Sequence, residues 1–599
     1  MVKKNISILL FLILLFATIS SEAEESRWEP WSQEIFARAS KEQKFVILDL
    51  EAVWCHWCHV MEETTYQNPK VQKLLDEKFI SVRADQEAYP DLAARYEDWG
   101  WPATIVFAAD GTEIIKRRGY IPPGAMVSLL EAIIKDPTPG PSVMAEPTGE
   151  PVGQSFLPAK NKKTLEAEHD SLYDEKFGGW GERHKLIDMA NMEYALTRVF
   201  DGDKKEEIRA RRTLDEALNL LDPEWGGFYQ YSDELNWKSP HFEKIMPIQS
   251  GYMRIYAVSY ALWKDVRYLM AAQAIFRYVK DFWTSPEGAF YTSQDADVGS
   301  DFLGNKFYSL GDKDRRALGR MPRIDTHIYS RENGWMISGL LSLYEVTGDG
   351  DYLDAGTRAA EWILGNRSRA EGGFSHAGKD NAGPFLEDTL SMGQAFLELY
   401  AATADQKWLA QSEKAALFID ETFRHKEAGY LMFQPKSATG VFAKPVRQLE
   451  AQIALARWTN LLYHYTGHSE YRSMAEHAMK YLTAPVLLDS RGFLAGILVA
   501  DRELSTEPAH LTVVGLKSDL VAQTLYRAAL TFPAFYKRIE WWDKTKGNLP
   551  RGDVTYPDLG KPAAFVCANQ SCSLPYDEPV RLLKAIENHR AAKANKDSS

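Results

Sequence analysis

Residues 44–58 read KFVILDLEAVWCHWC, and this stretch decides the fold of the N-terminal part of the chain. The run from Phe45 to Leu50 is apolar and contains β-branched residues between charged neighbours, which predicts a buried strand. Cys55 and Cys58 follow after a short turn. Helical spacing then runs from His59 to Phe79, with an interruption near Asn68-Pro69. We therefore expect a strand, a Cys-x-x-Cys turn and a helix in succession.

The elements that follow extend this pattern. Strands are predicted at 79–84 and 104–108, the second directly behind Trp101-Pro102, and Gly111 turns the chain into a further short apolar run. An amphipathic helix at 126–134 closes the region. The order β, Cys-x-x-Cys-α, β, α, proline-β, β, α is that of a thioredoxin. We therefore expect an α/β thioredoxin-like domain over residues 24–135.

The chemistry of disulfide exchange explains the cysteine spacing. A thiolate attacks a disulfide, so the attacking sulfur needs a lowered pKa, and a helix N-terminus provides it through unpaired N–H groups and the helix dipole. Cys55 is placed to attack, and Cys58, one turn further on, is placed to resolve the mixed disulfide. His56 and His59 add positive charge when protonated.

Two further residues join this candidate site. Asp49 stands six residues before Cys55 on the predicted strand, where a buried carboxylate would relay protons to Cys58. The alternative is a partly exposed strand acid. Pro102 is expected to pack against the Cys-x-x-Cys motif in the cis form, because cis X-Pro bonds usually have a structural purpose.

Two other uses of the cysteines stay open. Cys55-His56-Trp57-Cys58-His59 also matches C-x-x-C-H, the attachment pattern of a c-type haem. Zinc binding by the two cysteines and two histidines is the other alternative. Haem attachment does not explain the strand-rich flanks, and the closely spaced cysteines and histidines are hard to arrange tetrahedrally around zinc, so we expect no metal and no cofactor.

The run WCHWCHVMEETTYQNPKVQKLLDEKFISVRADQEAYPDL, Trp54 to Leu92, resembles the thioredoxin-like domain of the spermatogenesis-associated protein 20-like family. Its CHWCHVM stretch and the nearby Asp85-Gln86-Glu87 carry the resemblance. That family joins such a domain to a helical barrel like those of glycosidases and sugar epimerases. The resemblance therefore implies a multidomain chain, with an all-α (α/α)6 barrel after the thioredoxin-like domain.

The N-terminus predicts export. Lys3 and Lys4 precede an apolar run from Ile6 to Ile19, and Ser21-Glu22-Ala23 presents small residues at the cleavage position. We expect a signal peptide over residues 1–23 and a periplasmic or secreted protein, with membrane contact only if the peptide stays uncleaved. The net charge of −13 disfavours binding to nucleic acid.

A proline-rich stretch, 136–159, separates this domain from a repeated region. Leu-Tyr pairs begin at 343, 399 and 462, offsets of 56 (399−343) and 63 (462−399). Glycine–aromatic turns at Phe374, Tyr430 and Phe493 show the same two offsets. Earlier turns of this kind occur at Trp180, Phe228 and Phe290. Six such turns between amphipathic helices predict a closed (α/α)6 six-hairpin barrel over residues 160–535.

Polar residues near these turns form the candidate barrel site, because turns at one mouth of a barrel converge. They resemble the family's PHFEK, DAD and LED motifs and are His241, Glu243, Lys244, Asp295, Asp297, Glu387 and Asp388. Carboxylates of this kind can supply glycosidic acid/base chemistry. Their other role is to cap helices and pair with nearby cations. The family continues Phe-Glu-Lys with Met-Leu-Tyr-Asp-Asn, whereas this chain has Ile245 to Gln249, so the Asp and Asn of that run are missing.

The C-terminal segment predicts a small α/β element. Strands at 511–515 and 564–567 flank a helix near 519–531, and the extension is expected over 536–590 with a disordered tail at 591–599. Cys567 and Cys572 can form a disulfide, structural or exchanged with the first pair.

These patterns lead to one expectation and two alternatives. We expect an exported thiol–disulfide protein that acts on a thiol- or disulfide-bearing protein partner, with a barrel that binds a saccharide or a protein. The alternatives are a carbohydrate-active enzyme with an accessory redox domain and a non-catalytic binding module.

Overall fold

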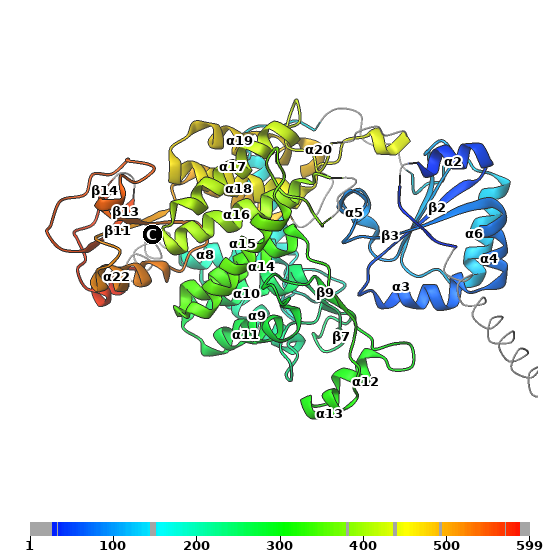
Figure 1. Cartoon of the computed structure of the whole chain (residues 1–599), viewed down its shortest axis with the longest axis horizontal. Helices are drawn as coiled ribbons and strands as arrows, with labels where there is room; N and C mark the ends of the chain where they lie inside the picture. The colour runs from blue at the N-terminus through cyan, green and yellow to red at the C-terminus, as the bar shows by residue number, and fades with distance from the viewer. Residues whose placement is uncertain are drawn as a thin grey trace, which may run out of the picture. The chain divides into compact units, whose positions relative to one another are not determined.

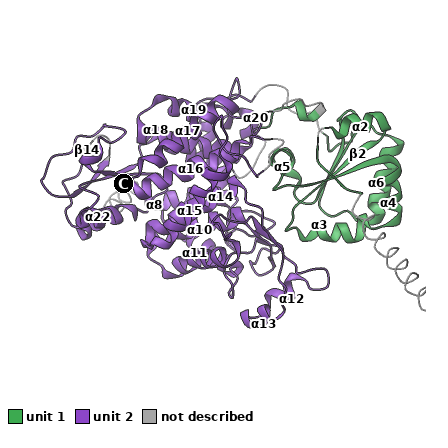
Figure 2. Ribbon diagram, in the orientation of Figure 1, with its two compact units in different colours: residues 1–146, 435–446 green, residues 147–434, 447–599 purple. Residues whose placement is uncertain are grey.

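A computed structural model describes residues 27–32, 34–143, 151–378, 383–434, 440–489, 494–568 and 571–586. The expected signal peptide, the C-terminal tail and the turn at Phe493 lie outside these residues. The chain forms two compact units (Figures 1 and 2). Unit 1 comprises Met1–Glu146 together with Pro435–Val446, and unit 2 comprises the rest. No helix among the described residues has the length and apolar composition that crossing a membrane requires.

Unit 1 has the thioredoxin-like fold, built on a five-stranded sheet in the order β1-β3-β2-β4-β5. β2 runs parallel to β3 and antiparallel to β4. The strands are β1 (Glu29–Pro30), β2 (Phe45–Glu51), β3 (Phe79–Asp85), β4 (Ala103–Phe107) and β5 (Glu113–Arg118). The helices are α2 (Ile35–Glu42), α3 (His56–Met61), which continues as a π-helical turn (Glu62–Tyr66), α4 (Pro69–Lys78), α5 (Pro90–Tyr96) and α6 (Pro123–Lys135).

Both faces of the sheet are covered, which explains why β2 reads as a continuous apolar run. α4 and α6 pack on one face through side chains such as Leu75 and Leu130. α2 and α5 contribute Phe36 and Tyr96 to the other face. The second cluster also contains Phe442, from a distant part of the sequence.

Unit 2 is an all-α (α/α)6 barrel whose helices alternate between an inner and an outer ring. Each inner helix contacts the next, and α21 contacts α8, so the inner ring is closed. The inner helices are α8 (Met189–Phe200), α10 (Met246–Trp263), α14 (Ser330–Thr347), α16 (Leu386–Thr403), α18 (Leu449–Thr466) and α21 (Ala495–Ser505). The outer helices are α7 (Ala159–Ser171), α9 (Lys204–Ala217), α11 (Val266–Tyr278), α15 (Gly350–Arg367), α17 (Gln406–Phe423) and α19 (Ser469–Leu482).

The glycine–aromatic turns share one local structure. In each described turn the aromatic residue forms an isolated antiparallel bridge to a residue a few positions or fewer beyond the outer helix, as Phe374 does with Ser368 and Tyr430 with Arg424. In the turns at Phe228, Phe290, Phe374 and Tyr430, a polar side chain of the next inner helix accepts the aromatic residue's N–H, for example Thr389 for Phe374 at 3.1 Å. The glycines are required because Gly373 has a φ of +68° and lies against Phe418.

The loops at the end of the barrel that carries the glycine–aromatic turns contain two small sheets and a longer segment with two short helices. β8 (Lys244–Ile245), β9 (Ser293–Gln294) and β10 (Ile324–Asp325) form a three-stranded antiparallel sheet, and β6 (Tyr231–Ser232) pairs with β7 (Pro240–His241). Between β9 and β10 the chain forms α12 (Gly304–Tyr308) and α13 (Asp312–Ala317), which project from the helical rings in Figure 1.

The C-terminal element differs from its expected bounds. A four-stranded sheet in the order β12-β11-β13-β14 begins at β11 (Ala509–Val514), inside the range expected for the barrel. Its other elements are α22 (Leu520–Leu530), β12 (Lys537–Trp542), β13 (Ala563–Ala568) and β14 (Ser571–Cys572). The barrel range also included residues 440–446, which instead belong to unit 1. The helical repeat ends at α21, so its period carries no information about these strands.

Candidate functional site

The Cys-x-x-Cys motif stands at the start of α3, and Cys55 and Cys58 form a disulfide. Cys55 is the N-cap residue, and its Sγ accepts the backbone N–H of Cys58 at 3.1 Å. An N–H aimed at this sulfur stabilises negative charge on it, so reduction of the pair favours a thiolate at Cys55. Both cysteines are buried, while Trp57 between them is 45% exposed.

A buried carboxylate lies behind the motif on β2. Asp49 is 3% exposed, faces Thr104 on β4 and pairs with Arg83 on β3. The Arg83 Nε is 3.2 Å from Asp49 Oδ2. Burial raises the pKa of Asp49 to about 6, although the Arg83 charge opposes the shift. Asp49 therefore exchanges its proton near neutral pH, in the range that a proton relay needs.

Arg83 gathers two more carboxylates, and sequence reasoning missed it. Its Nε is 3.4 Å from Glu51, its Nη2 pairs with Glu62 in the π-helical turn, and its guanidinium stacks 4.4 Å from the Trp28 ring centroid. Burial, followed by the charge of Asp49, raises the pKa of Glu51 to about 8. A basic residue within an otherwise apolar strand was the signal that could have identified it.

Pro102 lies at the edge of the sheet from which the motif departs. Its peptide bond with Trp101 is cis. The antiparallel register places Ala103 opposite Leu50, so Pro102 stands beside the end of β2, four residues before Cys55. The structure thus brings together the four predicted residues of this unit around one end of one sheet.

In unit 2, the three-stranded sheet collects part of the predicted barrel site. The pairing of Lys244 with Gln294 places Glu243 beside Asp295. Burial raises the pKa of Asp295 to about 7, and the charges of Asp297 and Glu243 add to the shift. His241 contacts Glu243 through Nδ1 at 3.5 Å.

His241 also contacts Asp233, through Nε2 at 2.7 Å. Burial lowers the pKa of His241, but the two carboxylates outweigh it and raise the value to about 8. Near neutral pH, His241 on β7 is therefore largely protonated beside Glu243, and Asp295 on the far side of Glu243 is partly protonated.

Lys244 points away from this group into a saturated ion cluster. Its Nζ donates to Asp222 Oδ2 at 2.9 Å and to the Gly226 carbonyl at 2.7 Å. Arg315 from α13 also donates to both oxygens of Asp222, at 2.8 and 3.0 Å. Each of the three side chains is fully buried. Through Asp222, Lys244 and Arg315 therefore link the segment between β9 and β10 to the glycine–aromatic turn at Phe228.

The remaining predicted pair begins α16. Asp388 Oδ1 is 2.8 Å from His376 Nδ1 and accepts the Arg331 N–H at 3.0 Å. Glu387 pairs with the Arg331 guanidinium at 3.0 Å, and its carboxylate lines the barrel interior. No hydrogen bond or ion pair described here joins this group to Glu243 or Asp295.

The barrel interior contains a cavity of about 360 Å³ whose polar lining, apart from Glu387, was not predicted from the sequence. Glu193 of α8 bridges Arg254 of α10 at 2.9 Å and Arg457 of α18 at 2.5 Å, and Arg457 also pairs with Glu503. Trp335 of α14 lines the same cavity. The sequence feature that could have identified these cavity residues was a charged residue on the inner face of each of several otherwise apolar helices.

The C-terminal cysteines are paired. Cys567 on β13 lies directly opposite Cys572 on β14, and the two form a disulfide. Cys567 also borders a cavity of about 790 Å³, together with residues of α8, α10, α18 and α21.

Comparison with known proteins agrees with this architecture. The Thioredox_DsbH family, described as a protein of unknown function, DUF255, matches residues 19–135. Spermatogenesis-associated protein 20 of Mus musculus is 28% identical over 45% of this chain and 38% of its own length. Uncharacterized protein B0495.5 of Caenorhabditis elegans is 24% identical over 94% of both chains. This chain is therefore similar to spermatogenesis-associated protein 20.

Other similarities concern the two units separately. The match to the mouse and human family members covers about two fifths of their own length. Thiol:disulfide interchange protein DsbD 2 of Pseudomonas aeruginosa is 33% identical over 17% of each chain. Among solved structures, cellobiose 2-epimerase from Bacillus thermoamylovorans is 10% identical over 54% of this chain and 85% of its own, with a TM-score of 0.43. The mannosidase Bt3792 of Bacteroides thetaiotaomicron is 13% identical over 58% and 97%, with a TM-score of 0.42.

Proposed function

We propose that this protein is a thiol–disulfide oxidoreductase acting on protein partners through Cys55 and Cys58. The observation that carries the proposal is the Cys58 N–H aimed at Cys55 Sγ from the N-terminus of α3. It distinguishes the two sulfurs, because the backbone donor described for this motif stabilises the thiolate of Cys55. The buried Asp49 on the preceding strand and the similarity to thiol:disulfide interchange proteins support the same reading.

The reaction proceeds in two exchanges. The Cys55 thiolate attacks one sulfur of a partner disulfide, forms a mixed disulfide and releases the partner's other sulfur as a thiolate. Cys58 loses its proton to a base, for which we propose Asp49, and its thiolate attacks Cys55 Sγ. The Cys55–Cys58 disulfide forms, and the partner leaves with two reduced sulfurs. In the reverse direction the same steps oxidise a dithiol partner.

The test is a glutathione redox titration of the mature protein, read by alkylation and mass spectrometry. We expect a reversible two-electron transition at Cys55–Cys58, in the range of known oxidoreductases, about −120 to −270 mV. The transition should be absent from Cys55→Ser. A pair that does not cycle, or a visible spectrum of haem, would refute the proposal.

We further propose that the protein is exported, which places it where disulfides persist. The basic residues and apolar run of residues 1–23 support this. Expression of the full chain in a bacterial host, followed by fractionation and N-terminal sequencing, should recover a periplasmic form beginning near Glu24. A form retaining Met1 in the cytoplasmic fraction would contradict it.

A second candidate function is saccharide binding in the barrel, and the cavity favours it. Sugar rings stack on aromatic side chains and hydrogen-bond to planar charged groups, and Trp335, Arg254 and Glu398 offer these groups around one space. The lining contains five carboxylates (Glu193, Glu387, Glu398, Glu450, Glu503) and two guanidiniums (Arg254, Arg457). This acidic excess favours a neutral or basic sugar over a uronic acid.

The cavity also sets the size of the ligand. It runs along the inner helices, from Glu387 and Glu450 in the first turns of α16 and α18 to Phe535 and Tyr536, which lie between α22 and β12 on the side where the inner helices end. It therefore suits a free monosaccharide or a chain terminus. Calorimetry with neutral hexoses, amino sugars and uronic acids tests this. Trp335→Ala should abolish binding and Trp57→Ala should leave it unchanged, whereas equal binding by both variants would exclude the cavity.

A further inference from the structure

A short segment of the helical part of the sequence is built into the thioredoxin-like unit. The chain leaves the barrel after α17 and returns at α18, and between them Pro435–Val446 belongs to unit 1. Residues 440–446, here called the strap, begin with a 3-10 turn at Gly440–Ala443. The strap carries one large aromatic residue, Phe442.

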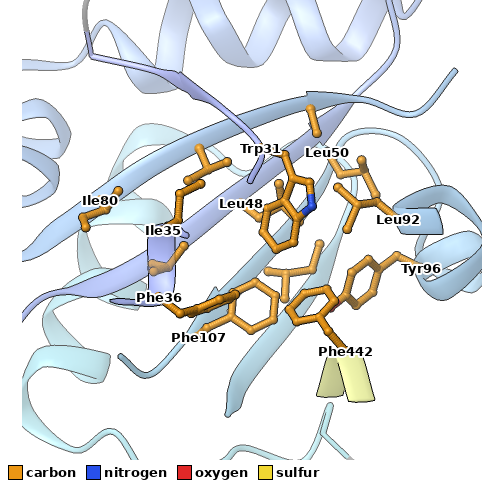
Figure 3. Close-up of a cluster of buried hydrophobic side chains, with 14 of the residues drawn as sticks. Trp31, Ile35, Phe36, Leu48, Leu50, Ile80, Leu92, Tyr96, Phe107 and Phe442 are labelled. Carbon is orange, nitrogen blue, oxygen red and sulfur yellow. The ribbon is translucent and has the colours of Figure 1, made fainter. Parts of the chain in front are cut away.

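Phe442 fills a place in the core of unit 1. Only 5% of its surface is exposed, and it belongs to the cluster formed by α2, α5 and one face of the sheet. Its ring centroid lies 4.9 Å from Trp31, 5.7 Å from Phe36 and 5.6 Å from Phe107. Figure 3 shows it closing the aromatic group from the side of α5. A buried aromatic with three ring neighbours is a core residue, since interiors tolerate few voids.

Polar contacts hold the strap in register. Arg95 of α5 donates from Nη2 to the Lys444 carbonyl at 2.9 Å, and its guanidinium lies 5.3 Å from the Phe442 ring centroid. Val441 packs against the same cluster. The contact thus combines an anchor in an apolar slot with a backbone hydrogen bond at its rim, as in peptide recognition.

We propose that the strap is an intramolecular ligand of the thioredoxin-like unit, so that this unit completes its core only with residues supplied by the barrel's sequence. The strap is tied to the barrel close by: Phe433 bridges Phe385, and the Leu386 N–H donates to Met432 at 2.8 Å where α16 begins. The redox unit is therefore joined covalently to the barrel's sequence on both sides of the strap, in addition to the linker. It acts as part of the whole chain and not as a separable module.

The experiment cuts the linker in the folded full-length protein. A specific protease site inserted between Val143 and Met144 leaves the strap as the covalent continuation of the barrel fragment only. After cleavage we expect the two fragments of the wild type to co-elute in size-exclusion chromatography, because the strap holds unit 1. Phe442→Ala should release the N-terminal fragment, and Phe442→Leu should retain most of it.

A second readout keeps the test independent of cleavage. In the uncut chain, amide exchange in α2, β2 and β4 should be about tenfold or more faster in Phe442→Ala, with exchange in the barrel helices unchanged. Phe156→Ala, which truncates an exposed aromatic residue of unit 2, is the matched control and should behave as the wild type. Wild-type fragments that separate on cleavage, or a Phe442→Ala protein that matches the control in both readouts, would overturn the proposal. Neither readout depends on redox activity.

Discussion

Asp49 and Arg83 are direct neighbours across the parallel pair of β2 and β3, with Arg83 Nε 3.2 Å from Asp49 Oδ2. The guanidinium also forms ion pairs with Glu51 and Glu62, so a single cation pairs with three carboxylates. Burial raises the pKa of Asp49 to about 6, because the charge of Arg83, shared among three carboxylates, offsets the desolvation of Asp49 only in part. The site behind the cysteines therefore holds a proton that is released near neutral pH.

This pKa predicts how stability depends on pH. The folded-state pKa of Asp49 lies above the unfolded value of about 3.9, so its contribution to stability is present below pH 4 and is lost as pH rises through 6. The free energy of unfolding of Asp49→Asn should therefore be higher than that of the wild type by up to about 3 kcal/mol at pH 8, and about equal to it at pH 4. Chemical denaturation at the two pH values measures the difference. Glu77→Gln, at an exposed ion pair, is the control. A stability difference that does not change between pH 4 and 8 would contradict the assignment.

The different environments of the two sulfurs predict which variant traps a partner. Cys58→Ser retains the attacking thiolate and should accumulate a mixed disulfide with a disulfide-bearing substrate protein, because nothing resolves it. Cys55→Ser should accumulate at least about tenfold less, since Cys58 lacks the backbone donor that Cys55 receives. Non-reducing electrophoresis after acid quenching measures both. Equal trapping would show that the roles are not divided in this way.

The buried cluster of Lys244, Asp222 and Arg315 predicts a structural role for the lysine of the PHFEK motif. Asp222→Ala leaves two buried cations without their shared partner and should lower the free energy of unfolding of the barrel by about 3–5 kcal/mol. Lys244→Met keeps the Asp222–Arg315 pair and should cost less. The comparison is chemical denaturation against Asp233→Asn, at an exposed carboxylate. An Asp222→Ala protein as stable as that control would show that this buried cluster does not stabilise the barrel.

Two glycines give a matched pair. Gly373 has a φ of +68°, and a Cβ there would meet the Phe418 ring at 2.3 Å, so Gly373→Ala should destabilise the barrel by more than about 1 kcal/mol. Gly365 lies inside α15 with open space around it, so Gly365→Ala should stabilise by about 0.5–1 kcal/mol. Thermal unfolding of the two variants should shift in opposite directions. Shifts of the same sign would show that the turn does not impose the strain described.

Local sequence was sufficient for much of unit 1. The apolar run of β2, the Cys-x-x-Cys spacing and the proline before β4 each reflect a short-range requirement: a strand covered on both faces, a helix N-terminus, a cis bond. The repeat of glycine–aromatic turns likewise predicted the barrel, since each hairpin needs the same backbone geometry. Both folds could therefore be predicted with no knowledge of long-range contacts.

The partners of the functional side chains could not be predicted in the same way. Lys244 and Glu243 are neighbours in one sequence motif, but successive strand residues point to opposite faces of a sheet. Lys244 therefore contacts Asp222, whereas Glu243 lies beside Asp295. The cavity residues Glu193, Arg254 and Arg457 come from three helices, and only closure of the ring brings them together.

By itself, the sequence determined which backbone each segment adopts, because strand periodicity, capping and turn glycines act over a few residues. Only the tertiary structure decided that Arg83 pairs with the carboxylates behind the cysteines, which charges face the barrel cavity, and that Phe442 belongs to the core of unit 1. These contacts join residues up to several hundred positions apart. Their energies depend on burial and distance, and burial and distance exist only once the chain has folded.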